Sequence, residues 1–332
     1  MSTVSGTPPR IARFPFPFPQ SQYRYSTNVE PARVPVPTAA GCWGEWMIDV
    51  DDEYADELAL RARVLSADPS RMGVAPHMRP ACWETLTECL REAARANPDT
   101  MTLVREGDFY VWSNALLGEE RRFRFGDELS LGAEPLAYVG SQIQEDMVLL
   151  DQRHGELWAD AGLVTFAADW SLRFDLGMTF LQIHGPVPRV HAEGVIPRAH
   201  QFLLRLEPQR PYRRTNWTMS VGRRLDQSTE AYPDWGPDRL AVLADPQRLP
   251  DRLQLRVEVQ HLIRLPASGA VLFLIRTSML SLRELATVPE WTQRFHEVLT
   301  ELPDDMVDYK GLTRFRDAAA DWLATAAVRL SD

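Results

Sequence analysis

The chain has 332 residues, of which 45% are hydrophobic and 25% are charged, so it is long enough to bury a large globular core. Its formal net charge of −10 gives no basic surface for DNA or for an anionic membrane. This negative charge excludes nucleic-acid binding as the expected function. No apolar run approaches the roughly 18 residues of a membrane span, and no signal-peptide pattern follows Met1. Three scattered cysteines are too few for a disulfide framework, and we expect a protein of the reducing cytoplasm without a membrane partner.

Residues 1–40 are rich in proline, serine and threonine, and they alternate phenylalanine with proline from Phe14 to Pro19. Such a segment favours extended, polyproline-like backbone and cannot form a core of its own. We predict a flexible N-terminal tail over residues 1–40, with its phenylalanines available to anchor it. A single domain is predicted over residues 41–330.

The first half of that domain mixes helices with strands. Apolar spacing predicts helices over residues 51–65 and 81–96, and Asn97-Pro98 ends the second helix. Residues 102–104 and 109–112 flank Glu106-Gly107-Asp108, which predicts a β-hairpin. Further along, we predict a helix over 135–150, a strand over 157–166, a loop or short turn over 170–177 and a helix over 196–206.

The clearest strands lie in the second half, at residues 214–221, 253–263 and 270–279. In the strand over 253–263, apolar residues and His261 share one face, while Arg256, Glu258 and Gln260 lie on the other. Ser268-Gly269 turns the chain into the next strand, and helices over 290–302 and 311–330 close the sequence. Because no alternating βαβ units occur, the pattern predicts an α+β fold with an antiparallel sheet.

Common catalytic motifs are missing. The sequence has no dinucleotide-binding glycine loop, no phosphate-binding loop, no zinc-binding Cys or His pairs and no esterase elbow. A haem site needs only one axial nitrogen and an apolar slot. The sequence has seven histidines that could supply such an axial nitrogen: His77, His154, His184, His191, His200, His261 and His296.

His184 is the best of these candidates. Pro186 and Pro188 restrict the backbone of the residues before them, so His184 is held at the start of a rigid turn that follows an apolar run. The alternative is a structural histidine that bonds a backbone carbonyl. His261 is the rival, as a core residue, an axial ligand or a distal group. The other histidines are predicted to be structural or on the surface.

Several stretches between residues 43 and 315 resemble, in order and spacing, the haem-dependent oxidative N-demethylase family. They are Gln144-Glu145-Asp146 with Val148-Leu149-Leu150, residues 166–170, Ile183-His184-Gly185-Pro186-Val187-Pro188, Arg214-Thr215-Asn216-Trp217, Arg256-Val257-Glu258-Val259-Gln260, Arg264-Leu265-Pro266, Ser268-Gly269-Ala270-Val271-Leu272-Phe273 with Ile275-Arg276-Thr277, and Tyr309-Lys310-Gly311-Leu312.

This resemblance implies a PAS-like antiparallel sheet, elaborated with N- and C-terminal helices, that holds haem b. His184 occupies the position of the proximal iron ligand. We then expect three arginines to pair with the haem propionates. The alternative for each of them is an ordinary ion pair with an acid. These arginines are Arg214, Arg264 and Arg276. Trp217 is expected to wall the haem pocket or to lie in the core.

The implied activity is that of a monooxygenase, an oxidative N-demethylase of small amines that uses O2 and releases formaldehyde. The resemblance also implies that electrons come from a separate NADPH-dependent reductase with flavin and iron–sulfur centres. This chain has motifs for neither centre, so we expect it to be the catalytic subunit only. Glu258, His261 and Asp146 are the candidate catalytic residues. Glu145 and Asp146 have a second interpretation, as capping or bridging groups at the surface.

Two departures from the family pattern leave alternatives open. Residues 171–177 lack the usual lysine before glycine, and Val259 and His261 replace polar residues. The substrate is therefore open, and a specialised haem oxidase of a natural-product pathway is one alternative. Others are a haem-PAS sensor of gas or redox state, in which His261 could be a second axial ligand, and a haem-free PAS-like binding module.

Overall fold

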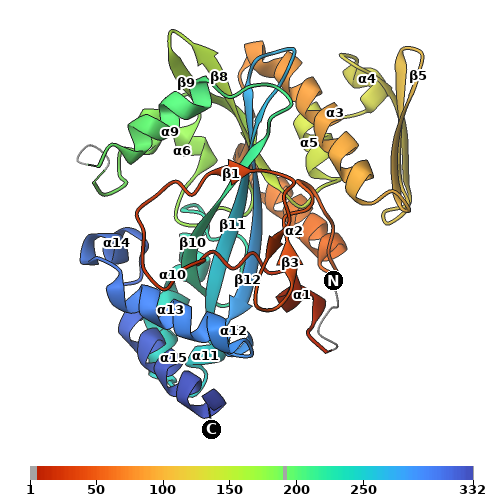
Figure 1. The fold of residues 1–332 in the computed structure, drawn as a ribbon. Helices are drawn as coiled ribbons and strands as arrows, with labels where there is room; N and C mark the ends of the chain where they lie inside the picture. Colours follow the sequence, from red (N-terminus) through yellow and green to blue (C-terminus); the bar gives the residue numbers. More distant parts are fainter. Residues whose placement is uncertain (1–5, 190–192, 332) are drawn as a thin grey trace.

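The computed structural model describes residues 6–189 and 193–331, and a seven-stranded antiparallel sheet forms its centre (Figure 1). The strand order is β1 (Glu30–Pro31), β10 (Tyr212–Val221), β11 (Leu253–Arg264), β12 (Val271–Ser281), β8 (Asp146–Arg153), β9 (Glu156–Leu163) and β4 (Met72–Val74). The predicted α+β class with an antiparallel sheet is therefore confirmed.

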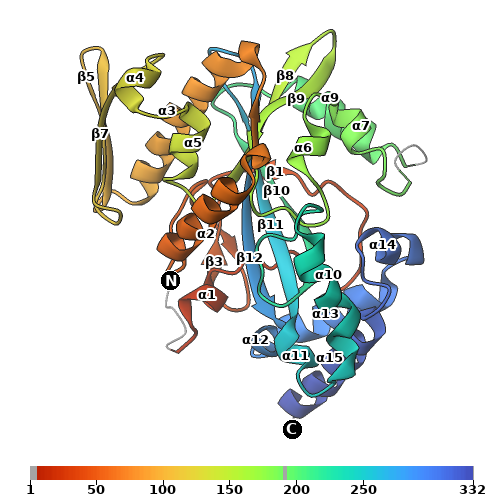
Figure 2. The same ribbon diagram turned by 180° about the vertical axis from the view of Figure 1, so that it is seen from behind.

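Helices pack on the sheet in three groups, which Figures 1 and 2 show from opposite sides. The first group includes α2 (Tyr54–Ala67), α3 (Arg79–Ala96), α4 (Glu128–Leu131) and α5 (Pro135–Gly140), next to the small sheet β5 (Met101–Glu106), β6 (Phe109–Asn114) and β7 (Glu119–Arg124). The second contains α6 (Leu172–Asp175), α7 (Phe180–Ile183) and α9 (Val195–Leu204). The third contains α10 (Tyr232–Ala241), α11 (Leu249–Arg252), α12 (Leu282–Leu285), α13 (Pro289–Glu301), α14 (Asp304–Tyr309) and α15 (Arg316–Ser331).

β11 is the best-predicted element, and it lies between β10 and β12. Every residue of β11 is buried, because both of its faces are covered. Its odd-numbered residues meet one face of the sheet and its even-numbered residues meet the other. The sheet therefore carries a buried row of polar groups, with Arg256, Glu258 and Gln260 in its central strand.

The predicted helix over 135–150 is confirmed in its first part and wrong in its second. Helix α5 ends at Gly140, and strand β8 begins at Asp146. Consecutive apolar residues at 148–150 are buried on both faces of the strand, so they show no alternation, and a short run of this kind cannot be distinguished from a buried helix. Residues 170–177, predicted as a loop or short turn, contain the single helical turn α6.

The phenylalanines of the N-terminal segment pack on the domain. Phe14, Phe16 and Phe18 are buried in the same hydrophobic cluster as α13. The ring of Phe16 stacks on Trp291 with centroids 4.8 Å apart, and that of Phe18 stacks on Phe295 at 5.4 Å. Burying large aromatic surfaces offsets the entropy lost when the segment is ordered, and the expected phenylalanine anchors thus fix the segment on the domain.

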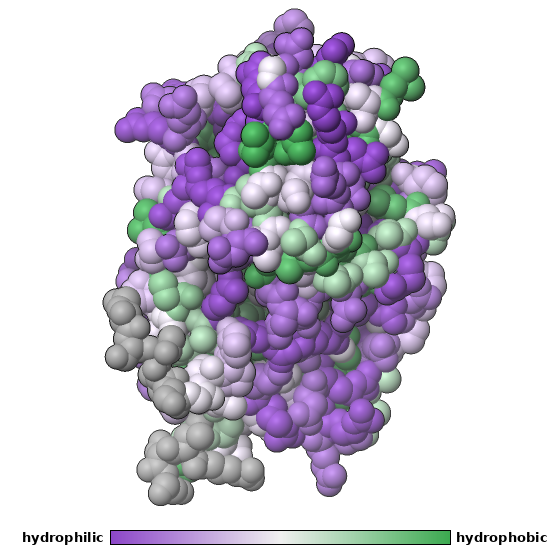
Figure 3. All heavy atoms as spheres, turned by 90° about the vertical axis from the view of Figure 1, so that its right-hand side faces the viewer, coloured by the Kyte–Doolittle hydropathy of each residue, from purple (hydrophilic) through white to green (hydrophobic). Residues whose placement is uncertain are grey.

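Hydrophilic side chains cover most of the face in Figure 3, with hydrophobic groups in small patches and a narrow band. Among the described residues, no helix combines the length and the apolar character that a membrane crossing requires.

Candidate functional site

His184 ends the short helix α7. A capping box between Thr179 and Gln182 stabilises the start of this helix. The Nδ1 atom of His184 lies 2.8 Å from the carbonyl oxygen of Phe180, and the two rings are 4.1 Å apart. Because a carbonyl oxygen can only accept a hydrogen bond, Nδ1 carries the proton, and Nε2 keeps a free lone pair. The apolar run before His184 forms the helical turn α7. The bond to the Phe180 carbonyl is also the contact expected if His184 is a structural histidine.

The surroundings of His184 keep the imidazole neutral. Burial, together with nearby Arg214, lowers the pKa of His184 to about 4, although the bond to Phe180 opposes this shift. Among the described residues, none forms a hydrogen bond with Nε2. A neutral imidazole with one fixed nitrogen and one free nitrogen is the form that binds a metal. The geometry thus allows His184 to bind iron.

Arg214 and Glu258 lie on the polar face of the sheet. Arg214 pairs with Gln260 across β10 and β11, and its guanidinium donates to the Gln260 side-chain oxygen at 3.1 Å and to the carbonyl of Thr27 at 3.1 Å. Glu258 accepts hydrogen bonds from the side chains of Gln260, at 3.0 Å, and Asn216, at 3.4 Å. The structure therefore brings His184, Arg214 and Glu258 into one electrostatic neighbourhood.

Lys310 joins this group, although the sequence did not single it out as a site residue. Its ammonium donates to the carbonyl of Trp217 at 2.6 Å and lies 4.6 Å from the centre of the Trp217 ring. Burial and Arg214 lower the pKa of Lys310 to about 8, while Glu258 raises it. One signal in the sequence could have found this residue, since it is the chain's single lysine.

His261 lies on the opposite face of the sheet. Its cross-strand neighbours are Arg213 and Leu274, it is only 3% exposed, and neither ring nitrogen has a hydrogen-bond partner among the described residues. Burial, together with Arg213 and Arg33, lowers the pKa of His261 to about 3. The structure does not bring His261 together with His184.

Replacing His261 with leucine is expected to raise the free energy of unfolding by about 1–2 kcal/mol at pH 7, because a buried polar group without a partner is removed. The gain should grow as the pH falls below about 6.5, since only the unfolded wild-type chain then binds a proton at this position. Urea unfolding at pH 7 and pH 5 measures both effects. A destabilised variant would contradict this expectation and would indicate a partner for the imidazole.

Asp146 belongs to a separate buried site. Its carboxylate forms a 3.0 Å ion pair with Arg61, and it accepts hydrogen bonds from the backbone of Thr165 and Phe166. Both charged side chains are 2% exposed. The neighbouring Glu145 is also buried. Neither residue lies at the surface, where bridging or capping groups were expected.

The other predicted haem-binding residues have partners that do not include His184. Arg264 donates to the carbonyls of Leu203, Leu204 and Leu206 at the end of α9. Arg276 forms ion pairs with Asp51 and Glu57 on the other face of the sheet. The ring of Trp217 packs edge-on against Phe18 and Phe295 in the core.

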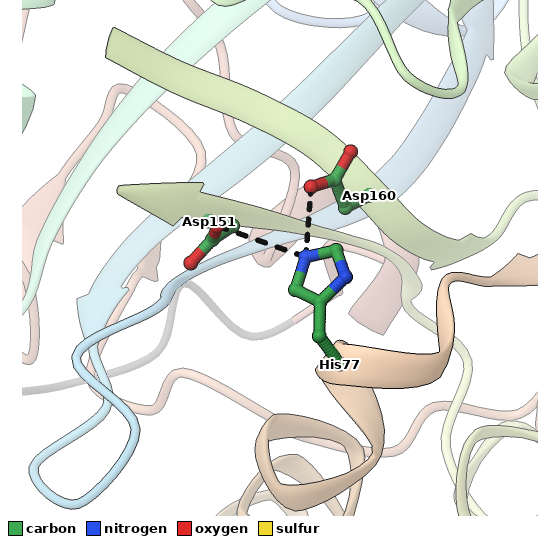
Figure 4. A group of neighbouring side chains, drawn as sticks. All are labelled: His77, Asp151 and Asp160. Atoms are coloured by element: carbon green, nitrogen blue, oxygen red, sulfur yellow. Dashed lines mark hydrogen bonds and ion pairs between the residues drawn. The ribbon is translucent and has the colours of Figure 1, made fainter. Parts of the chain in front are cut away.

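One further histidine lies in a group that could hold a metal ion (Figure 4). The Nε2 atom of His77 is 3.0 Å from Asp160 and 3.6 Å from Asp151. The guanidinium of Arg153 donates to both carboxylates, so a cation already offsets part of their negative charge. We interpret the group as an ion-pair network on the β8–β9 hairpin.

His191 lies outside the described residues, and His200 is buried, with its ring 6.0 Å from that of Phe180.

Two surface cavities lie away from His184. One, of about 440 Å³, is lined mainly by α9 residues and includes Arg198, Phe202 and Arg205. The other, of about 250 Å³, lies beside α2 and includes Glu53 and Glu57. Neither contains a residue of the group around His184.

Comparison with family models gives a match over residues 39–320 to the family described as "Haem-dependent oxidative N-demethylase, alpha subunit-like". This range includes every strand of the central sheet except β1, together with α7 and the group around His184. The resemblance seen in the sequence is thereby confirmed. The chain belongs to the haem-dependent oxidative N-demethylase alpha-subunit-like family.

Proposed function

We propose that the protein is a haem b-dependent monooxygenase that removes an N-methyl or related group from a small amine, with O2 and with electrons from a separate reductase. The observation that carries this proposal is His184, a neutral histidine whose Nδ1 is fixed by the Phe180 carbonyl and whose Nε2 is free. Membership in the family supports haem as the group that His184 binds.

Other residues around His184 suit an apolar, flat cofactor with acidic groups. Ile183 and Val187 pack with Phe273 of β12 against one hydrophobic cluster. Arg214 supplies a positive charge close to the imidazole, as a haem propionate requires. As part of the proposal, the sheet is an elaborated PAS-like sheet, and it positions these residues through the pairing of β10, β11 and β12.

When bound, haem would supply the oxidation that releases the N-methyl carbon as formaldehyde. The residues of the chain have simpler tasks. His184 would hold the haem iron through the lone pair of Nε2, and the Phe180 carbonyl fixes the plane of its ring. Glu258 is the carboxylate of this neighbourhood, and it can attract a cationic amine. Asp146 and His261 lie in other environments, so we assign them no step.

Replacing His184 with alanine should abolish the Soret band of protein reconstituted with haemin, or weaken haem binding by more than about 100-fold, because a direct ligand matters more than the residues that support it. The measurement is an absorption titration of the apoprotein. The glycine variant, supplied with imidazole, should recover the band, since a free ligand can fill the space.

His261→Leu is the matched control, because it removes a buried histidine from the other face of the sheet. It should keep the wild-type spectrum, with iron bound by one histidine. A wild-type protein that binds no haem would overturn the proposal. A bis-histidine spectrum that is lost in His261→Leu would instead support the haem sensor.

A further inference from the structure

Lys310 is the only lysine among the 36 lysine and arginine residues of the chain. It follows helix α14 directly and reaches the edge of strand β10, where its backbone carbonyl accepts a hydrogen bond from Thr218 at 3.1 Å. On the same strand edge, its ammonium donates to the carbonyl of Trp217. These two contacts fix the position of the only ammonium side chain in the protein.

Lys310 and Arg214 form a pair of cations without a carboxylate of their own. Among the described residues, neither forms an ion pair within 4.0 Å. Glu258 acts on both of them electrostatically, but it also lies 3.8 Å from the Nε atom of Arg256. Glu258 is therefore shared among these three cations, although Arg256 has other acids in its surroundings.

Four of the five buried arginines among the described residues have a carboxylate within 4.0 Å, and the fifth, Arg264, donates to backbone carbonyls instead. The half-buried Arg276 has two carboxylates, Asp51 and Glu57, and the buried Arg61 has Asp146. Partly buried cations lose hydration and are costly unless an anion lies nearby. The missing negative charge beside Arg214 and Lys310 therefore indicates a ligand.

We propose that Arg214 and Lys310 together bind a carboxylate group of a ligand held beside His184. The proposal rests on the proposed function. Arginine can bind a carboxylate with two parallel hydrogen bonds, and the compact ammonium of lysine adds a third. Two sources supply this chemistry, a propionate of haem or the carboxylate of an N-methylated amino acid as substrate. In the second case the substrate is an amino acid and not a simple alkylamine.

Selective acetylation of the wild-type protein tests the site directly, because Lys310 and the N-terminal amine are the only alkylamines of the chain. Peptide mass spectrometry separates the two positions. If a propionate is the ligand, haemin should slow acetylation of Lys310 about tenfold, and haemin dimethyl ester should not. If the substrate is the ligand, N-methylglycine should protect Lys310, and dimethylamine should not.

Variants test the same site through affinity. Lys310→Met should weaken binding of the protecting ligand about tenfold, in line with the loss of one hydrogen bond to a charged group. Lys310→Arg should retain most of the affinity, since it keeps the charge and a donor for the Trp217 carbonyl. Arg214→Gln is the second variant if Lys310→Met does not fold, and Arg205→Met, at an exposed position, is the control.

The outcomes separate this inference from the proposed function. Protection by N-methylglycine in a protein that binds no haem would overturn the proposed function and keep the carboxylate site. Haem binding with no protection by haemin or N-methylglycine, and with unchanged affinity in Lys310→Met, would overturn the carboxylate site alone. Absence of both haem binding and protection would overturn both.

Discussion

Replacing Asp146 with alanine should lower the free energy of unfolding by about 3–5 kcal/mol, the typical cost of breaking a buried ion pair. The variant leaves the guanidinium of Arg61 without its counterion, in a site where that side chain is 2% exposed. It also removes the acceptor for the backbone N–H groups of Thr165 and Phe166. Urea unfolding followed by tryptophan fluorescence measures the loss.

Glu207→Ala is the control for this prediction. Glu207 forms a 2.9 Å ion pair with Arg210 in which both side chains are more than 60% exposed, and exposed pairs contribute about 0–1 kcal/mol. A small loss in Asp146→Ala, together with loss of oxidative activity, would contradict the structural role. It would return Asp146 to the candidate catalytic residues.

Replacing Glu145 with glutamine should remove about 2–3 kcal/mol of pH dependence from the free energy of unfolding between pH 5 and pH 8. Glu145 is 1% exposed, and its Oε2 atom has no hydrogen-bond partner among the described residues. Burial raises the pKa of this carboxyl to about 7, although Arg276 and Arg61 oppose the rise.

The sign of the effect follows from the raised pKa. At pH 5 the folded protein keeps Glu145 protonated. In the unfolded chain this carboxyl has its normal pKa of about 4.3, so it is mostly ionised at the same pH. Stability should therefore fall as the pH rises from about 4.3 to about 7, and it should then level off. Glutamine does not titrate, so the variant should lose this part of the decline.

Denaturant unfolding at pH 5, 6, 7 and 8 provides the measurement for Glu145→Gln and wild type. The exposed Glu120, on β7, gives the control variant Glu120→Gln, which should follow the wild-type curve. Identical pH profiles for Glu145→Gln and wild type would mean that the carboxyl is ionised in the fold, and the prediction would be wrong.

Local patterns in the sequence were sufficient for much of the fold. Alternation predicted β11, and turn residues predicted the hairpin of β5 and β6. Apolar spacing predicted α2, α3 and α13 close to their observed bounds. These elements could be predicted because each has one periodic signal, set by neighbouring residues. The helix before His184 had a signal that was missed, the capping box of Thr179 and Gln182.

The boundary between α5 and β8 needed tertiary information. Arg61, on α2, donates to the backbone carbonyls of Gly140, Ile143 and Gln144. These acceptors lie between the helix and the strand, where the backbone needs partners from outside. A local pattern cannot show a guanidinium that arrives from another helix.

By itself, the sequence determined the α+β class, the polar and apolar faces of β11, His184 as the candidate ligand and the family to which the chain belongs. Only the tertiary structure decided which polar residues meet. It placed His261 and Arg276 on one face of the sheet, and Arg214 and Glu258 on the other. It also brought Lys310 to β10 from the far end of the chain. The physical reason is that charge balance depends on distances between segments remote in sequence, and local residue patterns do not contain those distances.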